Sequence, residues 1–180
     1  MIEKEIERKA ILTKEQYESL LGKIVDKPVT KKVQINYYYD TDDYILLSND
    51  ETLRVRQIED KLELQYKYNK KIESGVRISN ESCDEINYLP EKIAIDGLIV
   101  KRIGFLLTER RSKRFDGYII FLDKNYYLGK VDYEIEMEAI NIEYMPTELY
   151  GISFNTVCKG KYTRFTDELL KQRDIYEISR

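Results

Sequence analysis

The 180-residue chain contains no histidine, and this absence removes several kinds of chemistry. Without an imidazole there is no Ser-His-Asp or Cys-His catalytic group, and no histidine-ligated zinc, haem or iron. Any catalysis must therefore depend on carboxylates, lysine, arginine, tyrosine or a metal ion that prefers oxygen ligands.

Cysteine and long apolar runs are also scarce. Cys83 and Cys158 lie far apart and match no metal-binding spacing, so we expect two buried free thiols in a reducing compartment. No apolar run approaches the roughly 20 residues of a membrane-spanning helix. The charged start of the chain does not resemble a signal peptide. The sequence therefore predicts a cytoplasmic protein with no membrane partner.

Charge is plentiful but nearly balanced. The 33 acidic and 30 basic residues give a net charge of −3, which is too small to indicate a nucleic-acid partner. Hydrophobic residues make up 42% of the chain, and no linker interrupts it, so we expect a single domain over residues 1–180. Tyrosine occurs 16 times and suits half-buried strand surfaces.

Many segments alternate apolar and polar residues, the pattern of a β-strand with one buried face. We expect strands over residues 1–12, 32–40, 52–58, 61–68, 74–81, 107–115, 118–123 and 131–139. Glu59-Asp60 and Asp116-Gly117 are expected to form hairpin turns.

Helices are expected where apolar residues recur at helical spacing. Thr13 and Gln16 fit a capping box at the start of the first helix. The predicted helices span residues 12–21, 90–107 (broken by Gly97), 141–155 and 163–173.

The charged faces of the predicted strands tend to carry one sign each. Glu5 and Glu7 share a face with Lys9, and Glu134 and Glu136 share a face of a late strand. The cations of the other strands include Arg54, Arg56, Lys67 and Arg110. In an open sheet these charges would face water. Inside a closed barrel they would have to neutralise one another, or be neutralised by a ligand and a metal.

Five segments, in order, resemble motifs of the CYTH superfamily, the triphosphate tunnel metalloenzymes. They are Glu5-Ile6-Glu7-Arg8-Lys9, Asn36-Tyr37-Tyr38-Tyr39-Asp40-Thr41, Leu53-Arg54-Val55-Arg56, Leu64-Gln65-Tyr66-Lys67 and Asp132-Tyr133-Glu134-Ile135-Glu136. The chain looks most like small bacterial CYTH proteins that are often described as candidate adenylate cyclases. The resemblance implies an α+β fold: an eight-stranded antiparallel closed β-barrel, open as a tunnel, with flanking helices.

The resemblance also implies roles for individual residues. Glu5, Glu7 and Lys9 would form the catalytic centre. The implied ligands of Mg²⁺ or Mn²⁺ are Glu5, Glu7, Asp123, Glu134 and Glu136. The implied phosphate-binding residues are Lys9, Arg54, Arg56, Lys67, Arg77, Arg110 and either Lys159 or Lys161. These types suit the task, because carboxylates prefer hard cations and guanidinium groups bind phosphate oxygens in pairs.

Some positions stay open at the level of sequence. Phe121 stands where the family often has an acid, which leaves the number of metal ions undecided. Glu63 and Glu138 share the charged faces, with structural and functional roles both open. Arg114 is expected at the rim or on the surface.

Three functions are compatible with these residues. The favoured one is metal-dependent hydrolysis of a triphosphate, with inorganic tripolyphosphate ahead of nucleoside or thiamine triphosphate because the shared residues all address phosphates. The others are a class-four adenylate cyclase, which forms cyclic AMP and pyrophosphate from ATP, and a module that binds polyphosphate or a nucleotide without turnover. A barrel whose charges merely satisfy one another is the simplest alternative. A homodimer, formed through helices or barrel walls, is also open.

Overall fold

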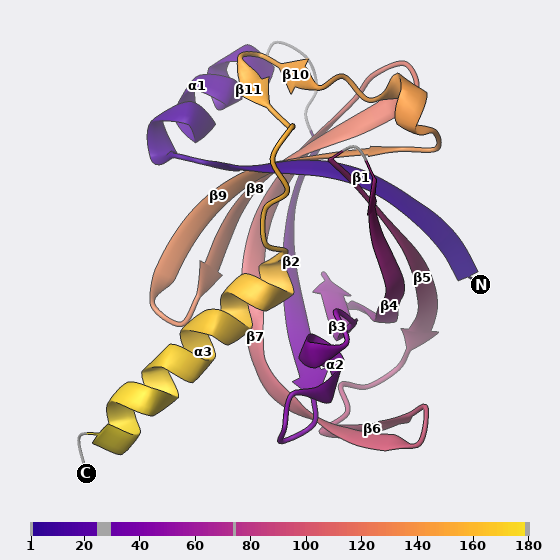
Figure 1. Ribbon diagram of the computed structural model, residues 1–180, viewed down its shortest axis with the longest axis vertical. Helices are drawn as coiled ribbons and strands as arrows, with labels where there is room; N and C mark the ends of the chain where they lie inside the picture. Colours follow the sequence, from indigo (N-terminus) through magenta and orange to yellow (C-terminus); the bar gives the residue numbers. More distant parts are fainter. Residues whose placement is uncertain (1, 25–29, 74, 179–180) are drawn as a thin grey trace.

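The chain folds around a closed sheet of antiparallel strands (Figure 1). The computed structural model describes residues 2–24, 30–73 and 75–178. The barrel order is β2-β3-β4-β5-β1-β9-β8-β7, and pairing of β7 with β2 closes it. The bounds are β1 (Ile2–Leu12), β2 (Thr30–Asp40), β3 (Thr52–Ile58), β4 (Lys61–Glu73), β5 (Val76–Ile86), β7 (Leu98–Arg114), β8 (Tyr118–Tyr127) and β9 (Lys130–Ala139). The predicted α+β fold with an eight-stranded antiparallel barrel is therefore confirmed.

The pairing of β2 with β7, which closes the barrel, contains an irregularity, and a helix packs against the barrel at this point. The register shifts between Tyr38 and Tyr39, and Gly104 lies opposite Tyr38. Gly104 has φ +154, and a Cβ there would lie 2.6 Å from the Phe165 ring of α3 (Lys161–Ile178). Only glycine avoids that overlap, so this position lets α3 pack against the barrel.

Helix α1 (Lys14–Ile24) covers the apolar side of one barrel wall, and its start confirms the predicted capping box. The Thr13 amide donates to Gln16 Oε1 over 2.8 Å, and the Gln16 amide donates to Thr13 Oγ1 over 3.2 Å. Tyr17 and Leu20 of this helix pack with Met137 of β9 in the largest apolar cluster. Because strand residues alternate, this packing leaves the opposite faces of the same strands turned inward.

The first turns of α3 lie against one part of the barrel, and the helix then runs away from it (Figure 1). Tyr162 and Phe165 pack with Tyr38 and Leu106. The Tyr162 hydroxyl donates to Asp40, whose carboxylate also accepts from backbone amides of α2 (Ile45–Ser48). The start of the helix is therefore fixed to the end of β2.

Two predicted helices are wrong. Within residues 90–107, the structure has a hairpin of β6 (Lys92–Ile95) and β7, turned by Asp96 and Gly97 with φ of 47 and 79. Within residues 141–155 it has a 3-10 helix, η1 (Ile142–Tyr144), and a small hairpin of β10 (Glu148–Leu149) and β11 (Ile152–Ser153). In both places a left-handed pair of residues reverses the chain and favours strand pairing.

Two other elements, a strand and a helix, are longer in the structure than the sequence predicts. The strand predicted to end at residue 123 continues to Tyr127, so Asp123 lies inside β8 and not at its end. The C-terminal helix was predicted over residues 163–173 and spans Lys161–Ile178. No helix in the described ranges is long and apolar enough to cross a membrane.

Candidate functional site

A polar cavity of about 330 Å³ lies inside the barrel, where the charged faces of the strands meet. Its lining includes most of the residues predicted to catalyse or to bind phosphate or metal: Glu5, Glu7, Lys9, Arg54, Arg56, Lys67, Arg77, Arg110, Glu136 and Lys161. They come from β1, β3, β4, β5, β7, β9 and the start of α3. Closure of the sheet therefore gathers charges that are up to 156 positions apart in the sequence, from Glu5 to Lys161.

Arg56 is a half-buried cation that makes no ion pair with a described residue. Its Nε donates to Asn36 Oδ1 over 3.1 Å, and no described carboxylate lies within ion-pair distance of its guanidinium. Burial, together with repulsion from Arg54 and Arg110, lowers the pKa of Arg56 to about 10. Arg56 is still charged at neutral pH, so this part of the cavity favours an anion.

The other two arginines of this region are partly neutralised. Arg54 donates to Gln65 over 2.7 Å and lies 3.6 Å from Glu81. Arg110 donates to both oxygens of Asp123, over 2.9 and 2.6 Å. Its guanidinium also lies 4.1 Å from the centre of the Phe121 ring. The aromatic side chain that departs from the family pattern therefore supports an arginine.

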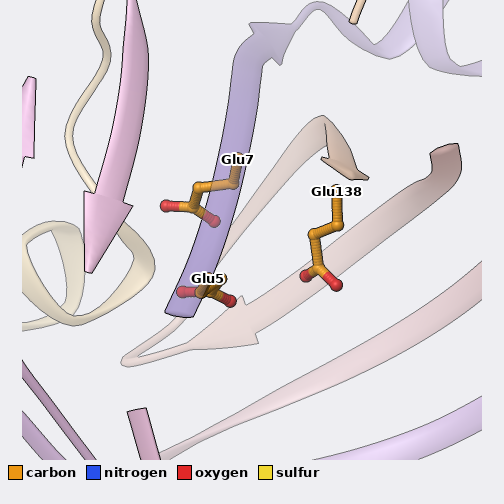
Figure 2. A group of neighbouring side chains, drawn as sticks. All are labelled: Glu5, Glu7 and Glu138. Atoms are coloured by element: carbon orange, nitrogen blue, oxygen red, sulfur yellow. The ribbon is translucent and has the colours of Figure 1, made fainter. Parts of the chain in front are cut away.

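A first acidic cluster consists of Glu5 and Glu7 on β1 and Glu138 on β9 (Figure 2). One oxygen from each carboxylate lies within 4.8 Å of the others. Glu5 is 2.5 Å from Lys67 Nζ, and Glu7 is 3.0 Å from Lys9 Nζ. The cluster forms because the β1–β9 register places Glu7 opposite Glu138.

Glu138, like Arg56, is a charged residue of the cavity that makes no ion pair with a described residue. No cation in the described part of the chain lies within ion-pair distance of its carboxylate. Burial, and then the nearby Glu5 carboxylate, raise the pKa of Glu138 to about 7. A half-buried carboxylate that resists ionisation beside two others fits a site for a divalent cation with oxygen ligands.

A second acidic cluster, of Asp123, Glu134 and Glu136, already holds cations from the chain itself. Lys161 Nζ contacts all three carboxylates, at 2.9 Å from Asp123 and 3.0 Å from Glu136. Burial alone would raise the pKa of Glu136, but Lys9 and Arg110 hold it well below its usual range. Arg110 and Lys161 likewise lower the pKa of Asp123, so Asp123 and Glu136 are ionised in this arrangement.

The structure distinguishes the two candidate lysines before and in α3. Lys161 is 7% exposed and lines the cavity. Lys159 is 64% exposed, pairs with Asp167 over 2.7 Å and is not among the residues that line the cavity. Arg77, whose register was uncertain, lines the cavity and lies 3.5 Å from Glu7.

The structure also shows how exposed Arg114, Glu63 and the two cysteines are. Arg114 is exposed, as predicted. Glu63 is half-buried and accepts from Gln65 over 3.2 Å. The expectation of two buried thiols is wrong: Cys83 is exposed and Cys158 is half-buried, although both are free.

Sequence reasoning missed several polar residues that line the cavity, among them Lys32, Ser79 and Glu81. Ser79 donates to Glu5 over 3.1 Å, and Glu81 lies 3.5 Å from Lys67. Ser79 and Glu81 share a face with Arg77 on β5. The two-residue alternation on that strand could have identified them, had its register been clear.

A closed antiparallel barrel that gathers cations and carboxylates around an internal cavity has the architecture that the resemblance implied for triphosphate tunnel proteins. The chain belongs to the CYTH domain family, which matches it over residues 3–147.

The relatives carry two kinds of name. The chain is 32% identical over 150 residues to YjbK of Bacillus subtilis strain 168, named as a candidate triphosphatase, covering 75% of this chain and 77% of YjbK. Its structure resembles a candidate adenylate cyclase from Bacillus halodurans with a TM-score of 0.68, 26% identity and coverage of 91% and 98%. HpAC1 from Hippeastrum is a candidate adenylyl cyclase described as having a dominant triphosphatase activity. It gives a TM-score of 0.65 and 25% identity, with coverage of 77% and 81%. These relatives support an enzyme of the CYTH type.

Proposed function

We propose that the protein hydrolyses a triphosphate inside the barrel with the help of Mg²⁺ or Mn²⁺, and that inorganic tripolyphosphate is the favoured substrate. The supporting observation is that Arg56 and Glu138, both half-buried in one cavity, have no opposite charge within ion-pair distance among the described residues. A buried charge without a partner is costly, so these two indicate an anion and a cation that the chain itself does not supply.

The phosphate chain would lie along the cations of the cavity. The proposed contacts are Lys9, Arg54, Arg56, Lys67, Arg77, Arg110 and Lys161, each of which lines the cavity. Arginines would bind pairs of phosphate oxygens and lysines would act as point charges. Since all these groups address phosphates, a molecule that is mostly phosphate satisfies them fully. Nucleoside and thiamine triphosphates are the other candidates of this class.

Glu5, Glu7 and Glu138 would hold the divalent metal, since their oxygens lie within 4.8 Å of one another. When bound, the metal would neutralise phosphate charge and lower the pKa of an attacking water. Asp123, Glu134 and Glu136 are a second candidate group, which Lys161 would have to leave.

Lys9 would act as a fixed cation at the catalytic centre together with Glu5 and Glu7. Burial alone would lower the pKa of Lys9, but Glu136 and Glu7 raise it above its ordinary value. The ammonium therefore keeps its proton at Nζ and can stabilise charge on a phosphate oxygen as the bond to the leaving group breaks.

An adenylate cyclase is the second candidate, because structural relatives carry that name. It would use the same cations and carboxylates on ATP. A module that binds without turnover is the third.

The test is product analysis with tripolyphosphate, ATP and thiamine triphosphate, each with Mg²⁺ and with Mn²⁺. We expect phosphate release, fastest from tripolyphosphate, and no cyclic AMP. Cyclic AMP with pyrophosphate from ATP would favour the cyclase. Binding of tripolyphosphate without turnover of any of the three would contradict the enzyme and favour the binding module.

A further inference from the structure

Strand β2 contributes uncharged polar side chains to the cavity inside the barrel, which is lined mostly by charged residues. Gln34 and Tyr38 line this charged cavity, and Asn36 lies between them on the same face of the strand. All three side chains are buried, with exposed fractions of 2%, 0% and 0% for Gln34, Tyr38 and Asn36. None of the three has a part in the proposed hydrolysis.

Each of these side chains has a buried polar atom without a hydrogen-bond partner among the described residues. The atoms are Gln34 Nε2, Asn36 Nδ2 and the Tyr38 hydroxyl. The Asn36 amide is held with its nitrogen turned away from Arg56, because Asn36 Oδ1 accepts from Arg56 Nε over 3.1 Å. A buried donor without a partner costs free energy, and such donors are rare in folded proteins. Three of them on one strand face indicate an acceptor that the described chain does not supply.

The closed sheet places β2 across the cavity from the proposed metal site. In the barrel order β2 and β1 are four of eight positions apart, so they lie on opposite walls. β1 carries two of the carboxylates that would hold the metal. On the other wall, the pairing of β2 with β3 places Asn36 beside Arg56 and Tyr38 beside Arg54. A phosphate chain between these walls would turn some oxygens to the metal and others to the arginines and uncharged donors.

The Tyr38 hydroxyl is held in place and keeps its proton. The Tyr38 ring packs against Tyr162 and Phe165 of α3, with ring centres 5.0 and 5.3 Å away. Burial raises the pKa of Tyr38, although Arg54 and Arg56 act in the opposite direction, so the hydroxyl is a donor at neutral pH. A fixed donor without a charge can bind a phosphate oxygen without adding to the repulsion among neighbouring arginines.

We propose that Tyr38 and Gln34 are further substrate-binding residues, which donate hydrogen bonds to phosphate oxygens on the wall opposite the metal. This inference rests on the proposed function and deepens it, because it adds uncharged donors to the cations that bind the phosphate chain. Binding of the triphosphate supplies the acceptors that these two buried donors lack in the described chain.

Tyr38→Phe tests the inference in the full chain, because it removes the hydroxyl and keeps the packed ring. Tyr39→Phe is the matched control: Tyr39 is also 0% exposed, but it lies on the opposite face of β2 and its hydroxyl donates to the Pro90 carbonyl over 2.6 Å. We expect Tyr38→Phe to raise KM for tripolyphosphate about tenfold, the effect of losing a hydrogen bond to a charged group. Its midpoint of thermal unfolding should be unchanged or higher, since an unpartnered buried hydroxyl is removed. Tyr39→Phe should lower the midpoint and leave KM unchanged.

Gln34→Leu is the second variant, because it replaces a buried amide by an apolar group of similar size. It should also raise KM for tripolyphosphate, with the midpoint of unfolding unchanged or higher. An unchanged KM in either variant would overturn the inference for that residue. Equal changes of KM in Tyr38→Phe and Tyr39→Phe would overturn it as well, because the effect would then not depend on the face of β2.

Failure of the proposed function is detected separately. If the wild type binds tripolyphosphate without hydrolysing it, the proposed hydrolysis is wrong, and Kd measured by calorimetry replaces KM. A Kd that rises in Tyr38→Phe and not in Tyr39→Phe would still support the inference. The same Kd in the wild type and Tyr38→Phe would overturn it, and absence of tripolyphosphate binding by the wild type would overturn both.

Discussion

At the scale of single residues, Arg56 and Glu138 show how the cavity differs from a self-neutralising interior. Most charges in it have an opposite charge nearby, as Lys67 has Glu5 at 2.5 Å. Arg56 and Glu138 have none within ion-pair distance among the described residues, and their pKa values move toward the neutral form. A chain selected only for stability would place apolar groups at such positions.

Arg56→Met should separate stability from binding. Removing an uncompensated buried cation should leave the free energy of unfolding of the ligand-free protein unchanged or higher. The same change should raise KM for tripolyphosphate by about ten- to a hundredfold, the value of a hydrogen-bonded charge. Urea unfolding and steady-state kinetics measure the two effects.

Arg111→Met is the control for this pair of measurements. Arg111 lies next to Arg110 on β7 and donates to Tyr17 of α1, away from the cavity. It should leave KM unchanged and lower stability slightly. A fall in stability in Arg56→Met without a change in KM would show that the arginine has a structural role only.

Glu138 predicts a pH dependence of stability in the metal-free protein. Its folded pKa of about 7 lies above the ordinary value of 4.5, so between these values the folded state binds more protons than the unfolded state. Stability should therefore fall as pH rises from about 4.5 to 7. Because Glu138→Gln cannot ionise, its stability should fall less over this pH range. Glu85→Gln changes an exposed residue, and its stability should depend on pH as that of the wild type does. Thermal unfolding at a series of pH values, with a chelator present, measures this dependence. Equal pH slopes in the wild type and Glu138→Gln would contradict the raised pKa of Glu138.

At the scale of elements, α3 adds two basic side chains to those of the strands. Its first residue, Lys161, enters the cluster of Asp123, Glu134 and Glu136. Arg164 follows one turn later and lies 2.8 Å from Glu134. The helix start is thus an electrostatic part of the barrel interior.

Lys161→Met should be strongly destabilising, because it leaves three buried carboxylates with less positive charge. We expect a loss of about 3–5 kcal/mol in the free energy of unfolding, typical of a broken buried ion pair. Lys159→Met, at the exposed position two residues earlier, should change it by less than about 0.5 kcal/mol. Equal effects in urea unfolding would contradict the placement of Lys161.

The elements also show where sequence reasoning succeeds and fails. The strands that carry Glu5, Arg54 and Glu136 could be predicted because their apolar and charged residues alternate. The β6–β7 hairpin could not, since its apolar residues also fit a helical spacing and Asp96-Gly97 was not recognised as a turn. Choosing Lys161 over Lys159 requires knowing that α3 begins at Lys161, which depends on packing against the barrel.

At the scale of the whole molecule, closure of the sheet determines which charges meet. Individual motifs predicted the types of residue, but the grouping of Glu138 with Glu5 and Glu7 follows from the β1–β9 register. Burial of these charges also depends on closure, because an open sheet would leave them in water. Membership of the CYTH family agrees with this arrangement.

In the proposed function, metal and triphosphate bind together in the charged cavity. The most direct measurement is the rate of phosphate release from tripolyphosphate as Mn²⁺ is titrated into the wild type, Glu5→Gln and Glu138→Gln. We predict metal-dependent turnover in the wild type. The variants should stay folded, need more metal and turn over at least tenfold more slowly. Wild-type rates in both variants, or no turnover of tripolyphosphate at any metal concentration, would contradict the account.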